Sequence, residues 1–190
     1  MEGKVLSPSK LAHVVLQTNK FEHMKRFYVQ FLGGRIIHAN DALAFISYDE
    51  EHHRIALLNV PDGRDKDLGS SGLAHIAFTF DSLKDLCTAY KQRKALGIEP
   101  GWCVNHGPTT SFYYRDPDGN QLETQVDNFD DPDEATAMMA SREFAENVLG
   151  ESILISEGYT LVCSFVCFRC GLRPRGAVRG GGTRRGRGKA

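Results

Sequence analysis

The amino-acid sequence predicts an α+β fold of two tandem βαβββ modules, followed by a C-terminal helix and a basic tail. The main observation is an internal repeat: the hexapeptide LAHVVL at residues 11–16 recurs 62 residues later as LAHIAF at residues 73–78. Both copies are apolar and contain β-branched residues, which favours buried strands. One helix-like segment and several strand-like segments follow each copy in the same order. We therefore expect two modules with equivalent residues at equivalent positions.

In the first module, the strand at residues 11–16 leads into a helix with its own start and stop signals. Asn19 and Glu22 are spaced as in a capping box, and Gly33 is suited to end the helix. The apolar stripe of this helix consists of Phe21, Met24, Tyr28 and Phe31. Three strands follow at residues 35–38, 42–48 and 54–60, before a Pro-Asp-Gly turn at residues 61–63. The first module therefore spans about residues 10–62.

The second module repeats this order over about residues 72–128. After the strand at residues 73–78, Ser82 and Asp85 provide the capping pattern, and Gly97 closes the helical unit. The apolar stripe consists of Leu83, Leu86 and Tyr90. Strands are expected at residues 110–115 and 120–126, with a second Pro-Asp-Gly turn at residues 117–119. Together the two modules form one domain at residues 10–128.

The chain changes character beyond this domain. Pro132 follows Asp131 in a typical helix start, and a helical face continues up to Gly150. Its members are Ala135, Met138, Met139, Ala145 and Leu149. We therefore expect a C-terminal helix within residues 129–150. Residues 151–190 run from an apolar, cysteine-containing patch into Gly/Arg-rich low complexity, which predicts a disordered or non-native tail.

Composition and charge indicate a globular protein of the cytoplasm. Of the 190 residues, 41% are hydrophobic and 25% are charged, and the net charge is −1. Residues 171–190 hold seven basic residues and no acidic one, so residues 1–170 carry the compensating charge of −8. No signal sequence or apolar run of the ~18 residues that span a bilayer is recognised. The five cysteines form no disulfide framework, which favours a reducing compartment. The Gly/Arg-rich residues 171–190 lack Phe and Tyr for base stacking, so they can bind nucleic acid only weakly.

Two histidines at matched repeat positions are candidate metal ligands. His13 and His75 stand third in their strands, and pseudo-twofold packing of the two modules would bring them together. A lone histidine among apolar residues is more often a hydrogen-bonded core residue, but two equivalent histidines favour a shared ligand. Glu123 is the candidate third ligand, because Gln121 and Gln125 make its strand face unusually polar; a solvated edge strand is the alternative. Two imidazoles and one carboxylate suit Fe(II) with open coordination positions, and also Mn(II).

Two longer patterns extend this ligand set. The first runs through Val104-Asn105-His106, Phe112-Tyr113, Asp116-Pro117-Asp118-Gly119 and Glu123, and the second is His52-His53-Arg54-Ile55-Ala56-Leu57. The repeat, the ligand spacing and these patterns resemble the vicinal oxygen chelate superfamily over residues 10–128. That superfamily includes glyoxalase I, fosfomycin-resistance transferases, bleomycin-binding proteins and type I extradiol dioxygenases. The signature is most similar to that of the small single-domain extradiol dioxygenases.

The resemblance implies both an activity and an assignment of residues. It makes His13, His75 and Glu123 the ligands of an iron(II) ion within a curved mixed sheet. It makes His53 the acid/base, and it brings His106 and Tyr113 into hydrogen-bond contact with the hydroxyls of a catechol-like substrate. The implied reaction is ring cleavage of a small aromatic substrate by O2, as in aromatic catabolism. The chemistry agrees, because a metal lowers the pKa of a bound hydroxyl and a nearby histidine can take its proton.

Two other functions remain open on the same scaffold. One is a metal-dependent lyase or transferase similar to glyoxalase or the fosfomycin-resistance proteins, and the other is a non-catalytic binding or resistance protein. Glyoxalase I has an additional carboxylate ligand in the last strand of its first module, and residues 54–60 offer none. Scaffolds of this kind often pair modules between chains, so a homo-oligomer is a further expectation.

Overall fold

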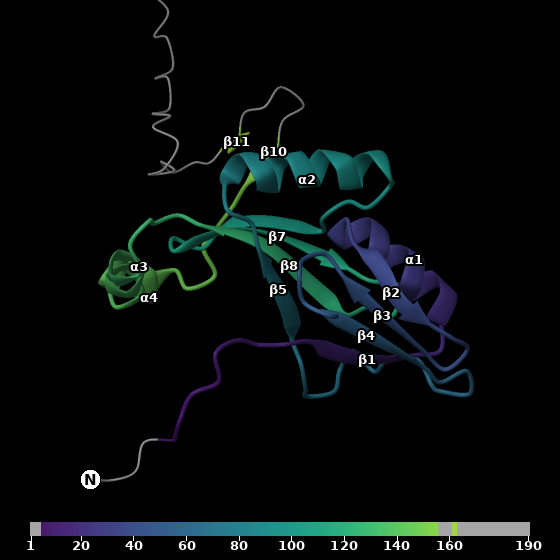
Figure 1. Ribbon diagram of the computed structural model, residues 1–190. Coiled ribbons are helices and arrows are strands. Elements are labelled where there is room, and N and C mark those ends of the chain that lie inside the picture. Colours follow the sequence, from purple (N-terminus) through teal and green to yellow (C-terminus); the bar gives the residue numbers. More distant parts are fainter. Residues whose placement is uncertain (1–4, 156–160, 163–190) are drawn as a thin grey trace, which may run out of the picture.

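The computed structural model describes residues 5–155 and 161–162, and it contains the two expected βαβββ modules (Figure 1). The first consists of β1 (Val14–Thr18), α1 (Phe21–Leu32), β2 (Arg35–Ala39), β3 (Leu43–Ser47) and β4 (Ile55–Asn59). The second consists of β5 (His75–Thr79), α2 (Leu83–Ala95), β6 (Trp102–Asn105), β7 (Thr109–Arg115) and β8 (Gln121–Asp127). The predicted fold class is thereby confirmed. Only β6 among these elements was not located from the sequence.

Each module has a mixed sheet of its own. The strand order is β1-β4-β3-β2 in the first sheet and β5-β8-β7-β6-β9 in the second, where β9 (Glu151–Ser152) extends the edge. In both sheets the first strand of the module pairs in parallel with its last strand, and the remaining pairs are antiparallel. The repeat in the sequence is therefore a repeat of topology. It places β1 and β5 at corresponding edges of the two sheets.

The helix signals of the sequence are only partly realised. Ser82 caps α2 as expected, because its side chain accepts a hydrogen bond from the backbone N–H of Asp85 at 3.1 Å. Gly33 ends α1 in the left-handed conformation at φ 62°, where glycine carries no steric penalty. The predicted capping box at Asn19 is wrong. Asn19 instead donates to the backbone oxygen of Gly63 at 3.0 Å, in the loop after β4, and the N-cap residue Lys20 makes no side-chain cap.

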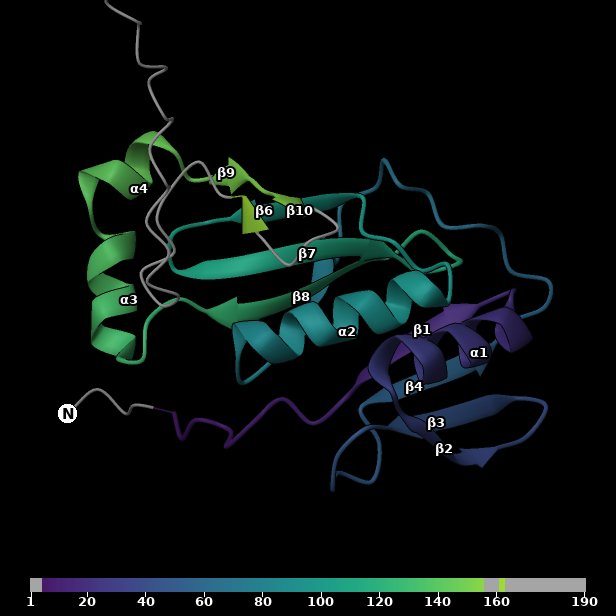
Figure 2. The same cartoon turned by 90° about the horizontal axis from the view of Figure 1, so that it is seen from above.

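One hydrophobic core joins the two modules. It contains the buried face of α1 (Phe21, Met24, Phe27, Tyr28, Phe31), residues of α2 (Leu86, Tyr90) and residues of both sheets (Leu16, Ile46, Ile55, Leu57, Ile76, Phe112, Tyr114, Leu122, Val126). The two helices lie side by side (Figure 2), and the Arg93 side chain donates to the backbone oxygen of Phe31 at 2.8 Å. Because the helices and the inner sheet faces share this core, the relative position of the modules is fixed by packing.

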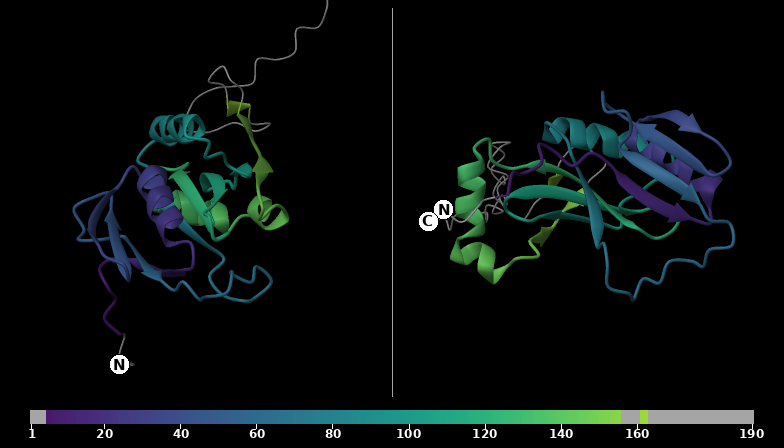
Figure 3. Two further views of the ribbon diagram at one scale, coloured as in Figure 1. Left: turned by 90° about the vertical axis from the view of Figure 1, so that its right-hand side faces the viewer. Right: turned by 60° about the horizontal axis from the view of Figure 1, so that its bottom comes forward.

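The segment after β8 forms two short helices instead of the single one predicted. The side chain of Asp131 caps α3 (Pro132–Met139). A second helix, α4 (Arg142–Glu146), begins after Ser141, whose hydroxyl caps it by accepting a hydrogen bond from the backbone N–H of Phe144. Both helices lie at the end of the second sheet, away from the first module (Figure 3). Two short strands, β10 (Leu154–Ile155) and β11 (Leu161–Val162), follow and pair antiparallel.

Most of the expected tail lies outside the described residues, so its predicted disorder or non-native origin stays a prediction. The cysteines of that tail also lie outside the described part, whereas Cys87 and Cys103 are free thiols. Among the described residues, no helix has both the length and the apolar character that crossing a membrane requires.

Candidate metal and catalytic site

In the second module, a buried carboxylate and an imidazole come into direct contact. Glu123 lies on β8 and is 5% exposed, and its neighbours in the sheet are Ala77 on β5 and Tyr113 on β7. Nε2 of His75, the first residue of β5, lies 3.0 Å from Oε2 of Glu123. The His75 side chain remains 39% exposed. Two of the three predicted metal ligands are thus brought together, one from each of two paired strands.

Tyr113 and His106 extend this pair along the same sheet. The hydroxyl of Tyr113 lies 2.9 Å from Nε2 of His106, which follows β6, and Trp102 stacks on the Tyr113 ring with centroids 5.1 Å apart. Burial raises the pKa of Tyr113 above its usual value, and the Glu123 charge and a hydrogen bond to it act in the same direction. Burial lowers the pKa of His106, which Glu123 partly offsets. Tyr113 therefore keeps its proton at neutral pH and can donate it in a hydrogen bond.

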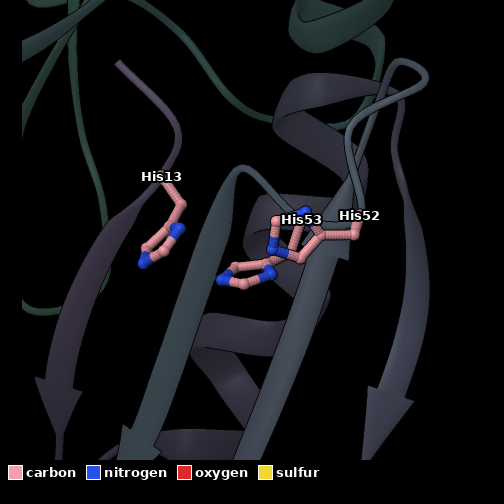
Figure 4. Close-up of side chains that lie close together, drawn as sticks. All are labelled: His13, His52 and His53. Atoms are coloured by element: carbon pink, nitrogen blue, oxygen red, sulfur yellow. The ribbon is translucent and has the colours of Figure 1, made fainter. Parts of the chain in front are cut away.

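In the first module, three histidines gather where β1 and β4 begin. His13 immediately precedes β1, and His52 and His53 lie in the segment before β4. The ring centroid of His53 is 4.2 Å from that of His13 and 4.4 Å from that of His52, and the three rings are turned toward one another in Figure 4. Phe45 stacks on His53 with centroids 4.5 Å apart. His53 is only 8% exposed as a result.

The surroundings of His53 keep it uncharged at neutral pH. Burial lowers the pKa of His53, and the neighbouring His13 and His52 lower it further, whereas Glu51 opposes them. Within the described part of the chain, Nδ1 of His53 is buried without a hydrogen-bond partner. His53 thus offers a neutral imidazole that can accept a proton.

The six predicted site residues therefore fall into two groups. His75, Glu123, Tyr113 and His106 form one group in the second module, and His13 and His53 belong to the other. Among the described residues, His13, His52 and His53 are the one group of three or more His, Cys, Asp or Glu with donor atoms all within 4.8 Å of one another. A single chain does not bring His13 to the His75–Glu123 pair at that distance. The ligand set drawn from the sequence stays a prediction.

The strand faces that carry His13 and His75 are more open than the sequence suggests. Both strands were expected to be buried, but only one face of each is covered by the core. Leu16 and Ile76 point into it, whereas Leu11, Val15 and Leu73 are exposed. Alternation along a strand explains the difference, because successive side chains point to opposite faces. The histidine-bearing faces thus present apolar surface to the outside.

Sheet register identifies the residue of the first module that corresponds to Glu123. Glu123 stands opposite Ala77 in the β5–β8 ladder, and Val15, the repeat counterpart of Ala77, stands opposite Ala56 in the β1–β4 ladder. Ala56 therefore occupies the equivalent position. The first module contributes an imidazole there but no carboxylate.

Three residues near these groups were missed as site components. Trp102 was missed because β6 was not located, although an aromatic residue shortly before the His106 pattern was a usable signal. Phe45 was missed because its proximity to His53 depends on the pairing between β3 and β4. His52, the sequence neighbour of His53, was missed because its approach to His13 depends on the pairing between β1 and β4. A pocket of about 540 Å³ also opens beside His106, between the ends of the strands and the two C-terminal helices. Phe129, Met138 and Phe144 form its apolar part.

Comparison with known proteins places the chain in a family. Residues 10–124 match the Glyoxalase/Bleomycin resistance protein/Dioxygenase superfamily. Biphenyl-2,3-diol 1,2-dioxygenase 2 of Rhodococcus globerulus is 49% identical over 144 residues, which cover 75% of this chain and 76% of that protein. Biphenyl-2,3-diol 1,2-dioxygenase 3 of the same organism is 45% identical over 155 residues, covering 79% and 82%.

Among solved structures, a glyoxalase/dioxygenase from Nostoc punctiforme shares the fold. It superimposes with a TM-score of 0.55 at 18% identity, over 67% of this chain and 99% of that one. The match of the family, the two dioxygenase relatives and the common fold agree with the resemblance inferred from the sequence. This chain belongs to the glyoxalase/bleomycin resistance protein/dioxygenase superfamily.

Proposed function

We propose that this protein is an Fe(II)-dependent extradiol dioxygenase, which opens a catechol-like aromatic ring with O2. The observation that carries the proposal is the contact of His75 with the buried Glu123, beside the Tyr113–His106 pair. The two Rhodococcus relatives support it, because both are named as dioxygenases of an aromatic diol. Mn(II) is the second candidate for the metal, since it accepts the same nitrogen and oxygen ligands.

The donor set fits such an ion. Glu123 is a buried carboxylate, which costs free energy unless a cation or hydrogen-bond donors compensate its charge. His75 contributes one imidazole nitrogen, and adding the equivalent imidazole of His13 completes two histidines and one carboxylate. This set leaves coordination positions open on Fe(II). A fourth protein ligand is absent at the equivalent position, because Ala56 stands there, and this argues against a glyoxalase-like lyase with two carboxylates.

We further propose that His13 comes from a second copy of the chain. Within one chain the helices pack against each other, so the histidine-bearing strand faces of both modules point away from the shared core. Leu11, Val15 and Leu73 are exposed on those faces. A twofold pairing that sets the first module of one copy against the second module of the other would cover this apolar surface. It would also form two identical sites, each with His13 from one copy and His75 and Glu123 from the other.

The chain's own residues have distinct tasks in this reaction. When bound, the metal lowers the pKa of a catechol hydroxyl and activates dioxygen. His53, neutral and desolvated, accepts a proton from the substrate and can return it later. The Tyr113 hydroxyl and His106 orient the substrate oxygens by hydrogen bonds and stabilise the charge that develops on them. Phe45 and Trp102 hold His53 and Tyr113 in place by stacking.

Complementation between two inactive variants tests both the activity and the shared site. His13→Ala and Glu123→Gln chains with different affinity tags are co-expressed, and mixed dimers are purified through both tags. Each mixed dimer contains one intact site and one doubly altered site, so we expect about half of the wild-type ring-cleavage rate per dimer. The rate is measured by the yellow product formed from a panel of catechols after anaerobic Fe(II) loading.

Two other outcomes would contradict parts of the proposal. Mixed dimers as inactive as the parents, beside an active wild type, would show that each site lies within one chain. A wild-type enzyme that contains iron but cleaves no catechol in the panel would overturn the proposed activity itself.

A further inference from the structure

A cluster of three histidines, a residue type that commonly binds metals, lies in the first module. The donor atoms of His13, His52 and His53 lie within 4.8 Å of one another in a single chain, before any partner is added. Two nitrogens on one tetrahedral zinc, each at about 2.0–2.1 Å from the metal, are about 3.4 Å apart. His13 and His52 are exposed, so theirs are the rings that would rotate to bring three nitrogens onto one ion. The cluster thus has the three donors of a three-imidazole metal site, spread more widely than they would be around a bound ion.

The position of His52 resembles that of a metal ligand. Its Nδ1 lies 2.8 Å from Oε1 of Glu51, which in turn pairs with Lys10. Histidines that bind metals commonly donate their other ring N–H to a carboxylate, which fixes the tautomer and turns the free nitrogen toward the ion. With Nδ1 held by Glu51, Nε2 of His52 is the nitrogen left for a ligand. The His52 side chain is 66% exposed, which gives an ion a path from solvent.

His53 provides an independent sign of a missing partner. Its side chain is more than nine-tenths buried, and among the described residues no group accepts from or donates to its Nδ1. A buried polar nitrogen without a partner costs free energy. A metal ion coordinated by Nδ1 of His53 together with His13 and His52 would remove that cost.

We propose that His13, His52 and His53 form a second metal site, which takes zinc(II) and competes with iron for His13. Three neutral imidazoles with one open position are a common set for zinc, whereas the iron set contains a carboxylate. Zinc in this site withdraws His13 from iron and His53 from the substrate at once. The competition with iron rests on the proposed function, but the binding of zinc does not.

Zinc binding is measured on the metal-free, full-length His75→Ala chain, in which the proposed iron set is already broken. Calorimetry gives the affinity, and the ring nitrogen signals of a ¹⁵N-histidine-labelled sample identify the ligands. We expect one equivalent of zinc to shift the signals of His13, His52 and His53. The additional substitution His52→Ala should weaken this binding at least about tenfold. Cysteines of the tail are common to all variants, and zinc held by them alone leaves the histidine ring signals in place.

His23→Ala in the same background is the matched control. His23 is exposed on α1, outside the cluster, so its removal should leave zinc affinity unchanged. Zinc that moves none of the three ring signals, in this chain or in the unaltered one, would overturn the proposal. So would a His52→Ala chain that binds zinc as tightly as its parent. The circular dichroism of each variant confirms that it is folded, and the titration of the unaltered chain decides the matter if a substitution prevents folding.

Competition is tested separately on the iron-loaded enzyme. Zinc should inhibit the unaltered enzyme, and His52→Ala should be at least about tenfold less sensitive. Equal sensitivity of the two would contradict the competition. An enzyme without ring-cleavage activity would refute the proposed function, whereas the zinc titration would still stand or fall on the ring signals.

Discussion

The hydroxyl of Tyr28 in the first module donates a hydrogen bond of 3.0 Å to the Asp116 carboxylate in the second. Asp116 also accepts from the backbone N–H groups of Asp118 and Asn120 and from the Asn120 side chain. Both Tyr28 and Asp116 are buried. This bond therefore connects α1 to the loop between β7 and β8, which positions Glu123 on the following strand.

Tyr28→Phe should lower the free energy of unfolding at pH 7 by about 1–2 kcal/mol, because the buried carboxylate loses one donor. The loss should shrink at alkaline pH. Burial and Asp116 raise the pKa of Tyr28 well above its usual value, so the folded chain keeps the proton while the unfolded chain loses it near pH 10. The stabilisation by the protonated Tyr28 hydroxyl is therefore present below pH 10 and lost as the pH rises above it. Urea unfolding between pH 8 and about pH 11 measures the difference. Phe27→Leu, which removes no ionisable group, should lower the free energy of unfolding by an amount that does not depend on pH.

Glu123→Gln should abolish stable iron binding while leaving the fold intact. The substitution keeps the size of the side chain but removes the charge that compensates the metal, so affinity should fall at least about 100-fold. Iron content after anaerobic loading and gel filtration measures this. The unfolding temperature with and without Fe(II) provides a second readout, since a ligand that binds the folded state raises it. Glu50→Gln, at an exposed residue, is the control, and equal iron retention by both variants would remove Glu123 from the ligand set.

Tyr113→Phe should lower kcat by about 100-fold with a smaller change in KM, because the lost hydroxyl stabilises charge that develops during the reaction. Iron content should remain that of the unaltered enzyme. Steady-state kinetics with a fixed catechol provide both constants. The neighbouring Tyr114→Phe is the matched control, since its side chain points to the opposite face of β7 and contacts the core. A Tyr113→Phe enzyme with full kcat would exclude the proposed donor.

Ala56→Glu should convert the three-ligand site toward a four-ligand one. In the sheet register Ala56 corresponds to Glu123, so a glutamate there would reach the same ion from the first module. Slower metal release and at least about tenfold lower ring-cleavage activity are expected, because an open position becomes occupied. Ala56→Gln has the same size without the charge and should not slow release. Unchanged release from the glutamate variant would mean that position 56 does not face the metal.

The two modules could be predicted from the sequence because they depend on local patterns. Each pattern determines the structure of residues close to it in the chain. This holds for the strand at each LAH segment, for the helix cap at Ser82 and for the helix end at Gly33. Asn19 has an equally good local pattern, yet its side chain donates a hydrogen bond to the backbone oxygen of Gly63. Gly63 is distant in the sequence, so a local capping pattern cannot predict this contact. Likewise, a continuous apolar face predicted one C-terminal helix, but the hydroxyl of Ser141 caps a new helix in its middle.

The candidate site was only partly predictable for a related reason. Sequence patterns predicted His75 and Glu123 as ligands, and the β5–β8 pairing brings these two residues together. The place of His13 depends on how the modules pack, and helix–helix packing in the core turns its strand face outward. No periodicity within either module contains that information. The approach of His52 and His53 to His13 is also a consequence of tertiary structure.

In the proposed pairing, the outward-facing strands of the two modules give each chain two different surfaces that fit each other. A twofold axis pairs both surfaces at once and closes the assembly, whereas a rotation that does not close leaves one surface free and allows the chains to add as a filament. Under this proposal, closure is a condition for solubility as well as for activity. Activity per chain should fall on dilution below the dissociation constant of the pair, and a substitution that alters the angle between α1 and α2 should favour filaments over dimers.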